Sequence, residues 1–469
     1  MLSTHQRSWW SLRDAHLHPA VATVMAAVVV ALSAIAVILD LWFLPLVVCS
    51  GVAVVFFSIR WPELWLYAVA LSLPVFFSSS EVGVSATDVA LGIFLIGTLC
   101  VWLLYSMLVV RRRFIENWFD TVLVLYMVFV TANVVVALAQ GTTLLDWLRV
   151  YSIGILVLYY FPVRVYCADR AVLKRFVILL TMVVVGLTMK SIIDYRSIVK
   201  ASEYAFQIAG RRVIPHVFLM SSLSAFVWAI HDRLTWKRIV PLALALLFVV
   251  GLVTTYARTT WLGFLFCIAI AQVFFTKKER GRTLAMLIGF AVITYGGITV
   301  VFGPTATLVT KVIANRFTSA SNVKKDQAVG NRVYESRTVA KYIDQNPIAG
   351  YGLASTYKGY DGIIGQSIPK TYIHNGFLAP IYSFGIVGAL FQYLLLIASV
   401  VHSYSVARRM KSTMAKVIAV SCFLTLVGMF IENITAAIFF FRSAVFVLAF
   451  ALAGVSLAER FDHQSQKSL

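Results

Sequence analysis

The sequence predicts an all-α polytopic membrane protein with about 12–14 transmembrane helices and one long extramembrane loop that contains amphipathic helices. Three observations predict this class. Hydrophobic residues make up 60% of the 469 residues, with a mean hydropathy of +0.87, which is more apolar surface than a soluble domain of this length could cover. Apolar stretches of about 20 residues, the length of a membrane-spanning helix, recur from residue 20 to residue 457. The short alternating segments of a transmembrane β-barrel are absent from the sequence.

Fourteen apolar stretches predict the transmembrane helices. Polar or charged residues separate them, so that each stretch forms one span and the spans are joined mainly by short loops. We expect the spans at 20–39, 41–59, 63–78, 87–110, 119–140, 146–166, 174–194, 213–231, 239–256, 259–276, 284–302, 375–402, 415–431 and 436–457.

Lysine and arginine alternate between successive loops, and this alternation predicts the orientation. Every second loop is rich in these cations, whereas the short loops between them are acidic or neutral. Because cytoplasmic loops carry the excess of Lys and Arg, we expect both termini in the cytoplasm. The loops 195–212 and 303–373 then lie outside, on the periplasmic face of a bacterial inner membrane. The cation-rich loops contain Arg60, Arg111 to Arg113, Arg164 to Arg175, Arg233 to Arg238, Lys277 to Arg282 and Arg408 to Lys416.

The long outside loop divides the chain into three parts. We expect N-terminal transmembrane helices at 1–302, a periplasmic loop at 303–373, and C-terminal transmembrane helices at 374–469.

Within the long loop, residues 331–345 have the pattern of an amphipathic helix. Asn346-Pro347 ends this helix, because the residue before a proline disfavours the helical conformation. Glycines predict irregular loop at 350–352 and 359–365. The apolar side of the helix would consist of Val333, Val339, Tyr342 and Ile343.

The composition also limits the partners and cofactors. The formal net charge is +20, but most basic residues fall in short loops beside spans, where topology and anionic lipid account for them. We therefore expect membrane lipids as partners and no nucleic acid. The five cysteines form no CxxC or Cys/His spacing, and the sequence has no Walker loop, dinucleotide fingerprint or outward Asp-x-Asp pair. We expect no metal site and no cofactor.

Arginines at the expected outer boundary are the first candidate functional residues. Arg258 opens a helix, Arg211 and Arg212 stand just before another, and Arg442 interrupts an aromatic run. A guanidinium offers a planar fork of donors that suits phosphate, so several of them at one depth would form a cradle for a pyrophosphate. The alternative is that each arginine lies at the interface or pairs with a carboxylate such as Glu432.

His374 is the second candidate, because it lies where the long polar loop runs into an apolar helix. A neutral imidazole can take a proton from a hydroxyl near neutral pH. The alternative is an interfacial histidine that hydrogen-bonds only Asn375 or the backbone. His216 is a weaker candidate for which we favour a structural role. Lys190 and Asp194 are one helical turn apart and are expected to pair with each other.

Two segments resemble the O-antigen ligase and polymerase superfamily. The sequence Tyr256-Ala-Arg-Thr-Thr-Trp-Leu-Gly263 resembles the arginine-led helix start of that superfamily. The stretch from Asn331-Arg332 to Asn346-Pro347-Ile-Ala-Gly-Tyr-Gly352, followed by His374-Asn375, resembles its long periplasmic loop.

The spacing after the histidine is similar to that of the ligases in this superfamily. His374-Asn375 is followed after nine residues by Gly385 and, after two more residues, by Gly388. Polymerases often carry a pair of Arg-x10-Gly motifs, and none begins at Arg211, Arg212, Arg258, Arg332 or Arg337. The resemblance therefore favours a ligase.

The resemblance implies a GT-C-like fold and an inverting, metal-independent glycosyltransferase. Such an enzyme transfers O-antigen polysaccharide from an undecaprenyl-pyrophosphate-linked donor to the lipid A–core oligosaccharide acceptor in the periplasm. Two catalytic residues would follow: His374 would deprotonate or orient the acceptor hydroxyl, and Arg258 would neutralise the departing pyrophosphate. The expected contacts to the pyrophosphate or the acceptor are Arg211, Arg212, Arg332, Arg337, Asn375 and Arg442.

Two alternatives remain open at this stage. One is a polymerase of O-antigen or exopolysaccharide that uses the same lipid-linked donor with a second lipid-linked glycan as acceptor. The other is a secondary transporter of an anionic solute, against which the absence of internal repeats argues.

Overall fold

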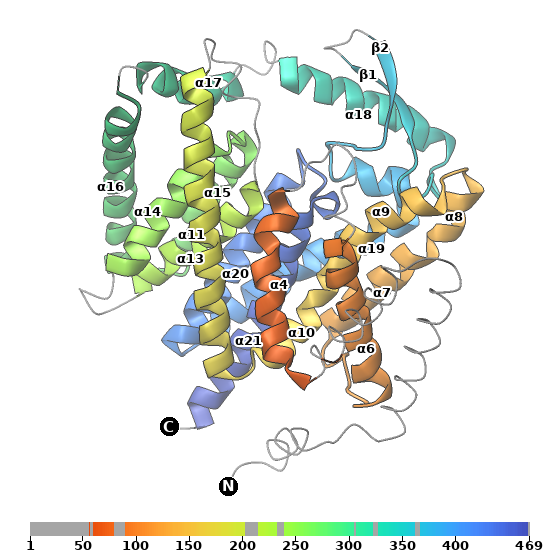
Figure 1. Cartoon of the computed structure of the whole chain (residues 1–469), viewed down its shortest axis with the longest axis horizontal. Helices are drawn as coiled ribbons and strands as arrows, with labels where there is room; N and C mark the ends of the chain where they lie inside the picture. Colours follow the sequence, from red (N-terminus) through yellow and green to blue (C-terminus); the bar gives the residue numbers. More distant parts are fainter. Residues whose placement is uncertain are drawn as a thin grey trace, which may run out of the picture. The chain divides into compact units, whose positions relative to one another are not determined.

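A computed structural model describes residues 56, 60–78, 90–201, 214–231, 239–303, 306–321, 327–361 and 366–467. This part of the chain is almost entirely α-helical (Figure 1), which confirms the predicted all-α polytopic class. Apart from residue 56, the predicted spans at 20–39 and 41–59 lie outside the described residues.

The described part contains eight helices that are long and apolar enough to cross a membrane. Three shorter apolar helices accompany them, and the chain is therefore a multi-pass membrane protein. The eight are Ala90–Leu108, Trp118–Ala139, Leu144–Tyr166, Arg170–Val199, Lys277–Val300, Leu378–Arg409, Thr413–Glu432 and Arg442–Lys467, and the shorter ones are Pro62–Val75, Ile239–Thr254 and Arg258–Ala271.

The chain forms two compact units, of which the first comprises residues 1–69 and 84–113. Its described helices are the start of α4 (Pro62–Ser78), the π-helical η1 (Ile93–Gly97) and α6 (Thr98–Leu108). The Trp65 ring stacks on Trp102 with ring centroids 6.2 Å apart, and its indole N–H donates to the Thr98 hydroxyl at 3.0 Å.

The second unit comprises residues 70–83 and 114–469 and contains the remaining elements. Among its candidate spans in the described residues, α20 and α21 are the most buried and α16 is the least. Its helices before the long loop are α7 (Trp118–Ala132), α8 (Val134–Ala139), α9 (Leu144–Gly154), η2 (Ile155–Tyr159), α10 (Tyr160–Tyr166), α11 (Arg170–Ala201), α13 (Pro215–His231), α14 (Ile239–Thr254), α15 (Arg258–Ala271) and α16 (Lys277–Phe302). The later elements are α17 (Ala306–Ser321), α18 (Gln327–Gln345), β1 (Tyr357–Asp361), β2 (Gln366–Lys370), α19 (Leu378–Arg409), α20 (Thr413–Glu432), η4 (Ile438–Phe440) and α21 (Arg442–Lys467).

Sequence reasoning misplaced two features before the long loop. The loop expected at 195–212 is helical in its first part, because α11 continues to Ala201. Arg164, counted among the loop cations, is instead a buried residue of α10 with only 4% of its side chain exposed. In α11 the predicted pair is confirmed, since the Lys190 ammonium lies 2.8 Å from the Asp194 carboxylate.

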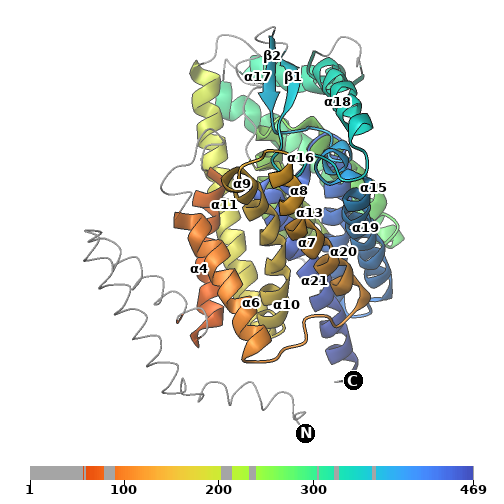
Figure 2. The same ribbon diagram turned by 90° about the vertical axis from the view of Figure 1, so that its right-hand side faces the viewer.

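The long loop folds onto one end of the bundle, and the C-terminus lies at the other end (Figures 1 and 2). The predicted amphipathic helix is α18, although Val333 is 45% exposed and does not belong to the buried side. That side carries Glu335, Val339 and Tyr342, which are spaced i, i+4 and i+7 along the helix. Val339 packs in a cluster with Tyr357, Ile373, Ala379 and Tyr382.

Part of the expected irregular loop at 359–365 is strand instead. Residues 359–361 belong to β1, which pairs antiparallel with β2 in the register Tyr357 with Lys370. The alternation of buried Tyr357 with exposed Lys358 and Tyr360 suits a strand with one face packed on α18. Residues 362–365 lie outside the described part.

The predicted helix 375–402 is not continuous, because α19 breaks at Gly385. This residue has φ of +66°, and a Cβ atom there would overlap the carbonyl oxygen of Ile348. The residues after α18 dock into the break through backbone hydrogen bonds. Tyr351 N–H donates to Tyr382 C=O at 2.8 Å, Gly352 N–H to Ser383 C=O at 2.9 Å, and Ile386 N–H to Pro347 C=O at 2.8 Å.

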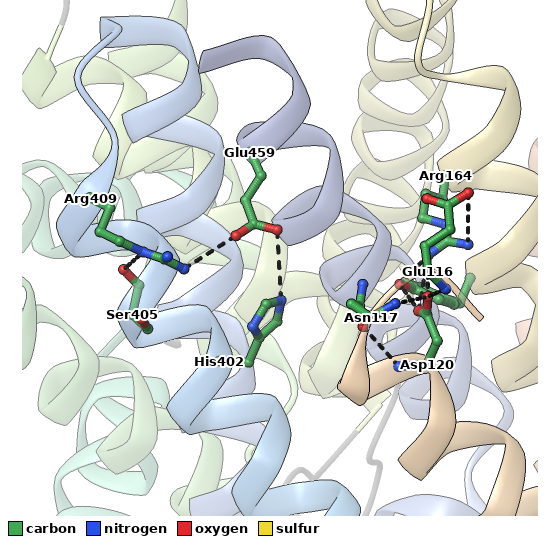
Figure 3. Close-up of polar contacts among 9 residues, drawn as sticks. Glu116, Asn117, Asp120, Arg164, His402, Ser405, Arg409 and Glu459 are labelled. Atoms are coloured by element: carbon green, nitrogen blue, oxygen red, sulfur yellow. Dashed lines mark hydrogen bonds and ion pairs between the residues drawn. The ribbon is translucent and has the colours of Figure 1, made fainter. Parts of the chain in front are cut away.

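Two polar clusters fix the opposite end of the bundle (Figure 3). The Arg164 guanidinium donates to both oxygens of the fully buried Asp120 carboxylate, at 2.9 and 2.8 Å. Asp120 also completes a capping box with Asn117 at the start of α7. In the second cluster the Glu459 carboxylate accepts from Arg409 at 3.3 Å and lies 4.0 Å from the His402 ring. These contacts tie α7 to α10, and α19 to α21.

Candidate functional site

A carboxylate holds the imidazole of His374. The Nδ1 atom of His374 lies 2.8 Å from one oxygen of Glu335, and the backbone N–H of His374 donates to the same oxygen at 3.2 Å. Helix α18 presents Glu335 on its buried side, so only 10% of the carboxylate side chain is exposed, against 41% of the His374 side chain. The acid is thus inside the fold, while the imidazole reaches its surface.

Tyr357 on β1 completes the environment of Glu335. Its hydroxyl donates to the second carboxylate oxygen at 2.6 Å and lies 3.1 Å from Tyr372 C=O. Burial by itself raises the pKa of Glu335, but the hydrogen bonds from His374 and Tyr357 outweigh it, and the net pKa lies below its ordinary value. Burial and the adjacent carboxylate raise the pKa of Tyr357, so that the phenol remains a donor.

An ionised carboxylate can only accept hydrogen bonds, so Nδ1 of the imidazole beside it is the donor. The neutral ring must carry its proton on Nδ1, next to Glu335, which leaves Nε2 with a free lone pair. A ring oriented in this way can accept a proton at Nε2, and the carboxylate then stabilises the imidazolium that forms. The pair has the geometry of a general base with its orienting acid.

The next two residues fix the loop that carries His374. The side chain of Asn375 accepts from the backbone N–H groups of Phe377 and Leu378 at 2.9 and 3.2 Å, and so caps the start of α19. The backbone N–H of Gly376 donates to Asn433 C=O at 2.9 Å, and the side-chain amide of Asn433 donates to Gly376 C=O at 3.0 Å. A Cβ atom on Gly376 would overlap the Asn433 side chain, so this close approach requires glycine.

The segment 433–441, between α20 and α21, brings further helix ends to the same place. The hydroxyl of Thr435 is 2.7 Å from that of Thr259, the second residue of α15. At the end of α20, Glu432 pairs with His216 in the first turn of α13, and both side chains are at most 4% exposed. The ends of α13, α15, α20 and α21 therefore meet beside the loop that begins α19.

Aromatic rings connect the two histidines of this region. The Tyr372 ring lies edge-on to His374, with ring centroids 4.9 Å apart, and 5.5 Å from Phe441. Phe441 in turn lies 5.6 Å from the ring of His216. Because Arg442 directly follows Phe441, the first residue of α21 belongs to this same group of helix ends.

The structure places the predicted residues unequally. His374 and Asn375 lie in one loop, and Arg258 and Arg442 begin helices whose ends meet segment 433–441. Arg337 is exposed and lies two positions after Glu335, which places it on the other side of α18. Arg332 lies about one turn before Glu335. Arg211 and Arg212 lie outside the described residues.

Two expectations about pairing change. Glu432, considered as a partner for arginine, pairs with His216, and this contact supports the structural role favoured for His216. His374 does more than contact Asn375 or the backbone, because its ring has a carboxylate partner. Sequence reasoning missed Glu335, Tyr357 and Asn433. For Glu335 a signal existed: it is an acid that aligns with Val339 and Tyr342 on one side of the helix.

The central part of the chain is similar to a known family. Residues 242–393 match the model of a family described as O-antigen ligase. The match begins in α14, includes Arg258, Glu335, His374 and both motif glycines, and ends in α19. No curated protein matches the chain. The family match confirms the resemblance drawn from the sequence.

Proposed function

We propose that this chain, a member of the O-antigen ligase and polymerase superfamily, is an O-antigen ligase. It transfers the polysaccharide from undecaprenyl pyrophosphate to the lipid A–core oligosaccharide, with inversion and without a metal ion, on the periplasmic face of a bacterial inner membrane. The observation that carries the proposal is the Glu335–His374 pair, an oriented base beside the place where the ends of α13, α15, α20 and α21 meet.

The base acts on the acceptor. Nε2 of His374 takes the proton of an acceptor sugar hydroxyl, and the oxygen uses its electron pair to attack the anomeric carbon of the donor. The bond from that carbon to the pyrophosphate oxygen breaks as the new glycosidic bond forms, which inverts the anomeric centre. The pyrophosphate leaves with the bonding electron pair, and the proton stays on His374 until the acid-stabilised imidazolium releases it to solvent.

The arginines act on the leaving group. Arg258 at the start of α15 supplies a guanidinium and the positive end of a helix dipole where charge develops on the pyrophosphate. Arg442 begins α21 at the same group of helix ends, and Arg211, Arg212, Arg332 and Arg337 are the further proposed contacts. Asn375, which caps α19, acts by holding the His374 loop as well as by any contact to substrate.

Metal independence is part of this proposal, because the guanidinium groups supply the positive charge that a divalent ion would otherwise provide. A chelator should leave the activity of the purified protein unchanged, whereas a strict requirement for Mg²⁺ would contradict this part of the mechanism.

Transfer by purified protein tests the function. The protein is given undecaprenyl-pyrophosphate-linked glycan together with either lipid A–core or a second copy of the lipid-linked glycan. A ligase elongates the lipid A–core, and a polymerase lengthens the lipid-linked glycan instead. His374→Ala should abolish transfer, and His463→Ala, at an exposed position near the end of α21, is the matched control. No transfer to either acceptor by wild-type protein would refute the proposal.

A further inference from the structure

Two tyrosines of the long loop form an exposed pair beside the candidate site. Tyr334 on α18 and Tyr360 on β1 are 52% and 45% exposed, and their rings meet edge to face with centroids 5.7 Å apart. Rings of this size stabilise a fold when they are buried. Here the packed cluster around Val339, Tyr357 and Tyr382 is formed without either of them. The two rings are therefore exposed for ligand binding and do not belong to the packed interior.

The backbone beneath the pair is held rigidly. The Tyr357 hydroxyl donates to Glu335, and the backbone N–H of Lys358 donates to the Tyr342 hydroxyl at 3.2 Å. Both contacts join the start of β1 to α18. The two exposed rings are thus presented in a fixed relation before anything binds, which reduces the entropy lost on binding.

Three cations share the exposed faces of α18 and β1 with the tyrosine pair. Arg337 and Lys341 follow Tyr334 at i+3 and i+7 and are exposed with it on one stripe of α18. Lys358 shares its face of β1 with Tyr360, two residues away. No ion pair engages these three cations among the residues that the structure describes. Flat rings with cations at their edge suit a ligand that has apolar faces and negative charge.

We propose that Tyr334 and Tyr360 form the binding platform for the acceptor, an oligosaccharide with phosphate or carboxylate substituents. The apolar faces of its sugar rings stack on the tyrosines, and Arg337, Lys341 and Lys358 bind its anionic groups. This inference rests on the proposed transferase function, to which it adds the binding subsite of the acceptor. It assigns the donor pyrophosphate to the opposite side of His374, at Arg258.

The position of the platform fits this role. Tyr334 directly precedes Glu335, and Tyr360 lies three residues beyond Tyr357, which is about 10 Å along a strand. A sugar chain bound there can extend one of its hydroxyls to Nε2 of His374. The hairpin and α18 lie at the end of the bundle that is opposite the C-terminus in both views (Figures 1 and 2), on the same side as the His374 loop.

Steady-state transfer kinetics provide the first test. Tyr334→Ala and Tyr360→Ala should each raise KM for the acceptor by roughly three- to tenfold, with kcat and KM for the lipid-linked donor unchanged. The phenylalanine variants keep the ring and should stay within about twofold of wild type. Tyr295→Ala on α16, a tyrosine 62% exposed, is the matched control. An equal rise for donor and acceptor, or no change for either, would overturn the proposal.

Binding without turnover provides the second test and separates it from the proposed function. In a His374→Ala background, calorimetry with delipidated core oligosaccharide should detect binding that both alanine substitutions weaken and that added salt weakens further. If wild-type protein fails to transfer but still binds the oligosaccharide through this pair, the platform stands and the ligase proposal fails. If the double alanine variant binds as tightly as its parent, the platform is refuted whatever the enzyme does.

Discussion

The charge of Glu335 can be tested separately from its shape by Glu335→Gln. Glutamine has nearly the same size, and its amide can still place an oxygen toward Nδ1 of His374, while its NH₂ group faces Tyr357. The Tyr357 hydroxyl can then donate to Tyr372 C=O, which is already 3.1 Å away. The substitution therefore keeps the ring in place and removes the negative charge that stabilises the imidazolium.

The expected loss of kcat follows from one hydrogen bond, between Glu335 and Nδ1 of His374, which strengthens when the imidazole becomes charged during the reaction. A hydrogen bond to a charged group contributes about 1.5–3 kcal/mol and a neutral one about 0.5–1.5 kcal/mol. The difference of about 1–1.5 kcal/mol corresponds to roughly a tenfold lower kcat. Glu335→Ala also removes the orientation of the ring and leaves the Tyr357 hydroxyl with one partner fewer, so its loss should approach 100-fold, the upper range for residues that orient catalytic groups.

The pH dependence has a definite sign. The pKa of Glu335 in the folded chain is below its ordinary value, so its contribution is complete above the ordinary carboxyl pKa and is lost as the pH falls through the folded value. The ratio of kcat between wild type and Glu335→Gln should therefore stay constant from about pH 5 to about pH 9 and decrease only in more acidic solution. Initial rates of transfer in detergent or proteoliposomes measure it.

Asp344→Asn is the control for this experiment. Asp344 is also an acid on α18 but is exposed, and its substitution should leave kcat unchanged. A Glu335→Gln protein with wild-type kcat would refute the role given to the carboxylate charge. A ratio that grows as the pH falls would refute the assignment of the ionised form.

Three further substitutions test other parts of the structure. Arg258→Lys should lose transfer nearly as fully as Arg258→Ala, because an ammonium lacks the planar fork; wild-type rates for the lysine form would show that charge alone suffices. Gly376→Ala should displace the His374 loop from Asn433 and lower kcat at least tenfold, whereas Gly289→Ala, where a Cβ meets no atom within 4 Å, should be silent in the same assay. Asp120→Ala should remove the close carboxylate partner of the buried Arg164 guanidinium and leave only Glu116 at 3.8 Å, at a cost of about 3–5 kcal/mol of stability. It should lower the melting temperature in detergent without changing KM, and an unchanged melting temperature would contradict the role of the Arg164–Asp120 contact drawn in Figure 3.

Hydropathy and local spacing were sufficient to predict the membrane class and most helix positions. A span is a property of about 20 consecutive residues, so the sequence contains all the information needed for it. The predicted stretches at 415–431 and 239–256 correspond to α20 and α14 within a few residues. The pairing of Lys190 with Asp194 is equally local. The sequence predictions agree best with the structure where the feature depends only on residues within one helical turn or one span.

The features that the sequence did not reveal depend on contacts between distant residues. Glu335 meets a histidine 39 positions later, and Gly376 meets a residue 57 positions later. Residues 359–361 of β1 were predicted as irregular loop, because glycines favour turns. The strands of the hairpin β1–β2 are stabilised by the burial of Tyr357 against α18, which local sequence does not encode.

In the sequence, the spacing from His374 to Gly385 and Gly388 is only a pattern. The structure supplies a physical reason for each of these glycines. Gly385 adopts a positive φ, and its missing side chain leaves room for the turn that follows α18. Gly388 packs against the ring of Phe129 on α7, which a Cβ atom would overlap. A spacing of glycines therefore predicted the position of two close approaches without predicting their partners.

The close backbone contact at Gly385 explains why the number of residues between His374 and Gly385 should affect the orientation of the His374 imidazole. Helix α18 holds the start of this segment, because Glu335 binds His374, and the turn that continues α18 holds its end through Tyr382 and Ile386. The segment is thus attached at two points to one continuous piece of chain. One additional residue between them would rotate the second attachment by about 100° about the helix axis, so that Tyr382 C=O could no longer face Tyr351 while the imidazole faced Glu335. The number of residues between His374 and the helix break at Gly385 therefore determines the direction in which Nε2 of His374 points.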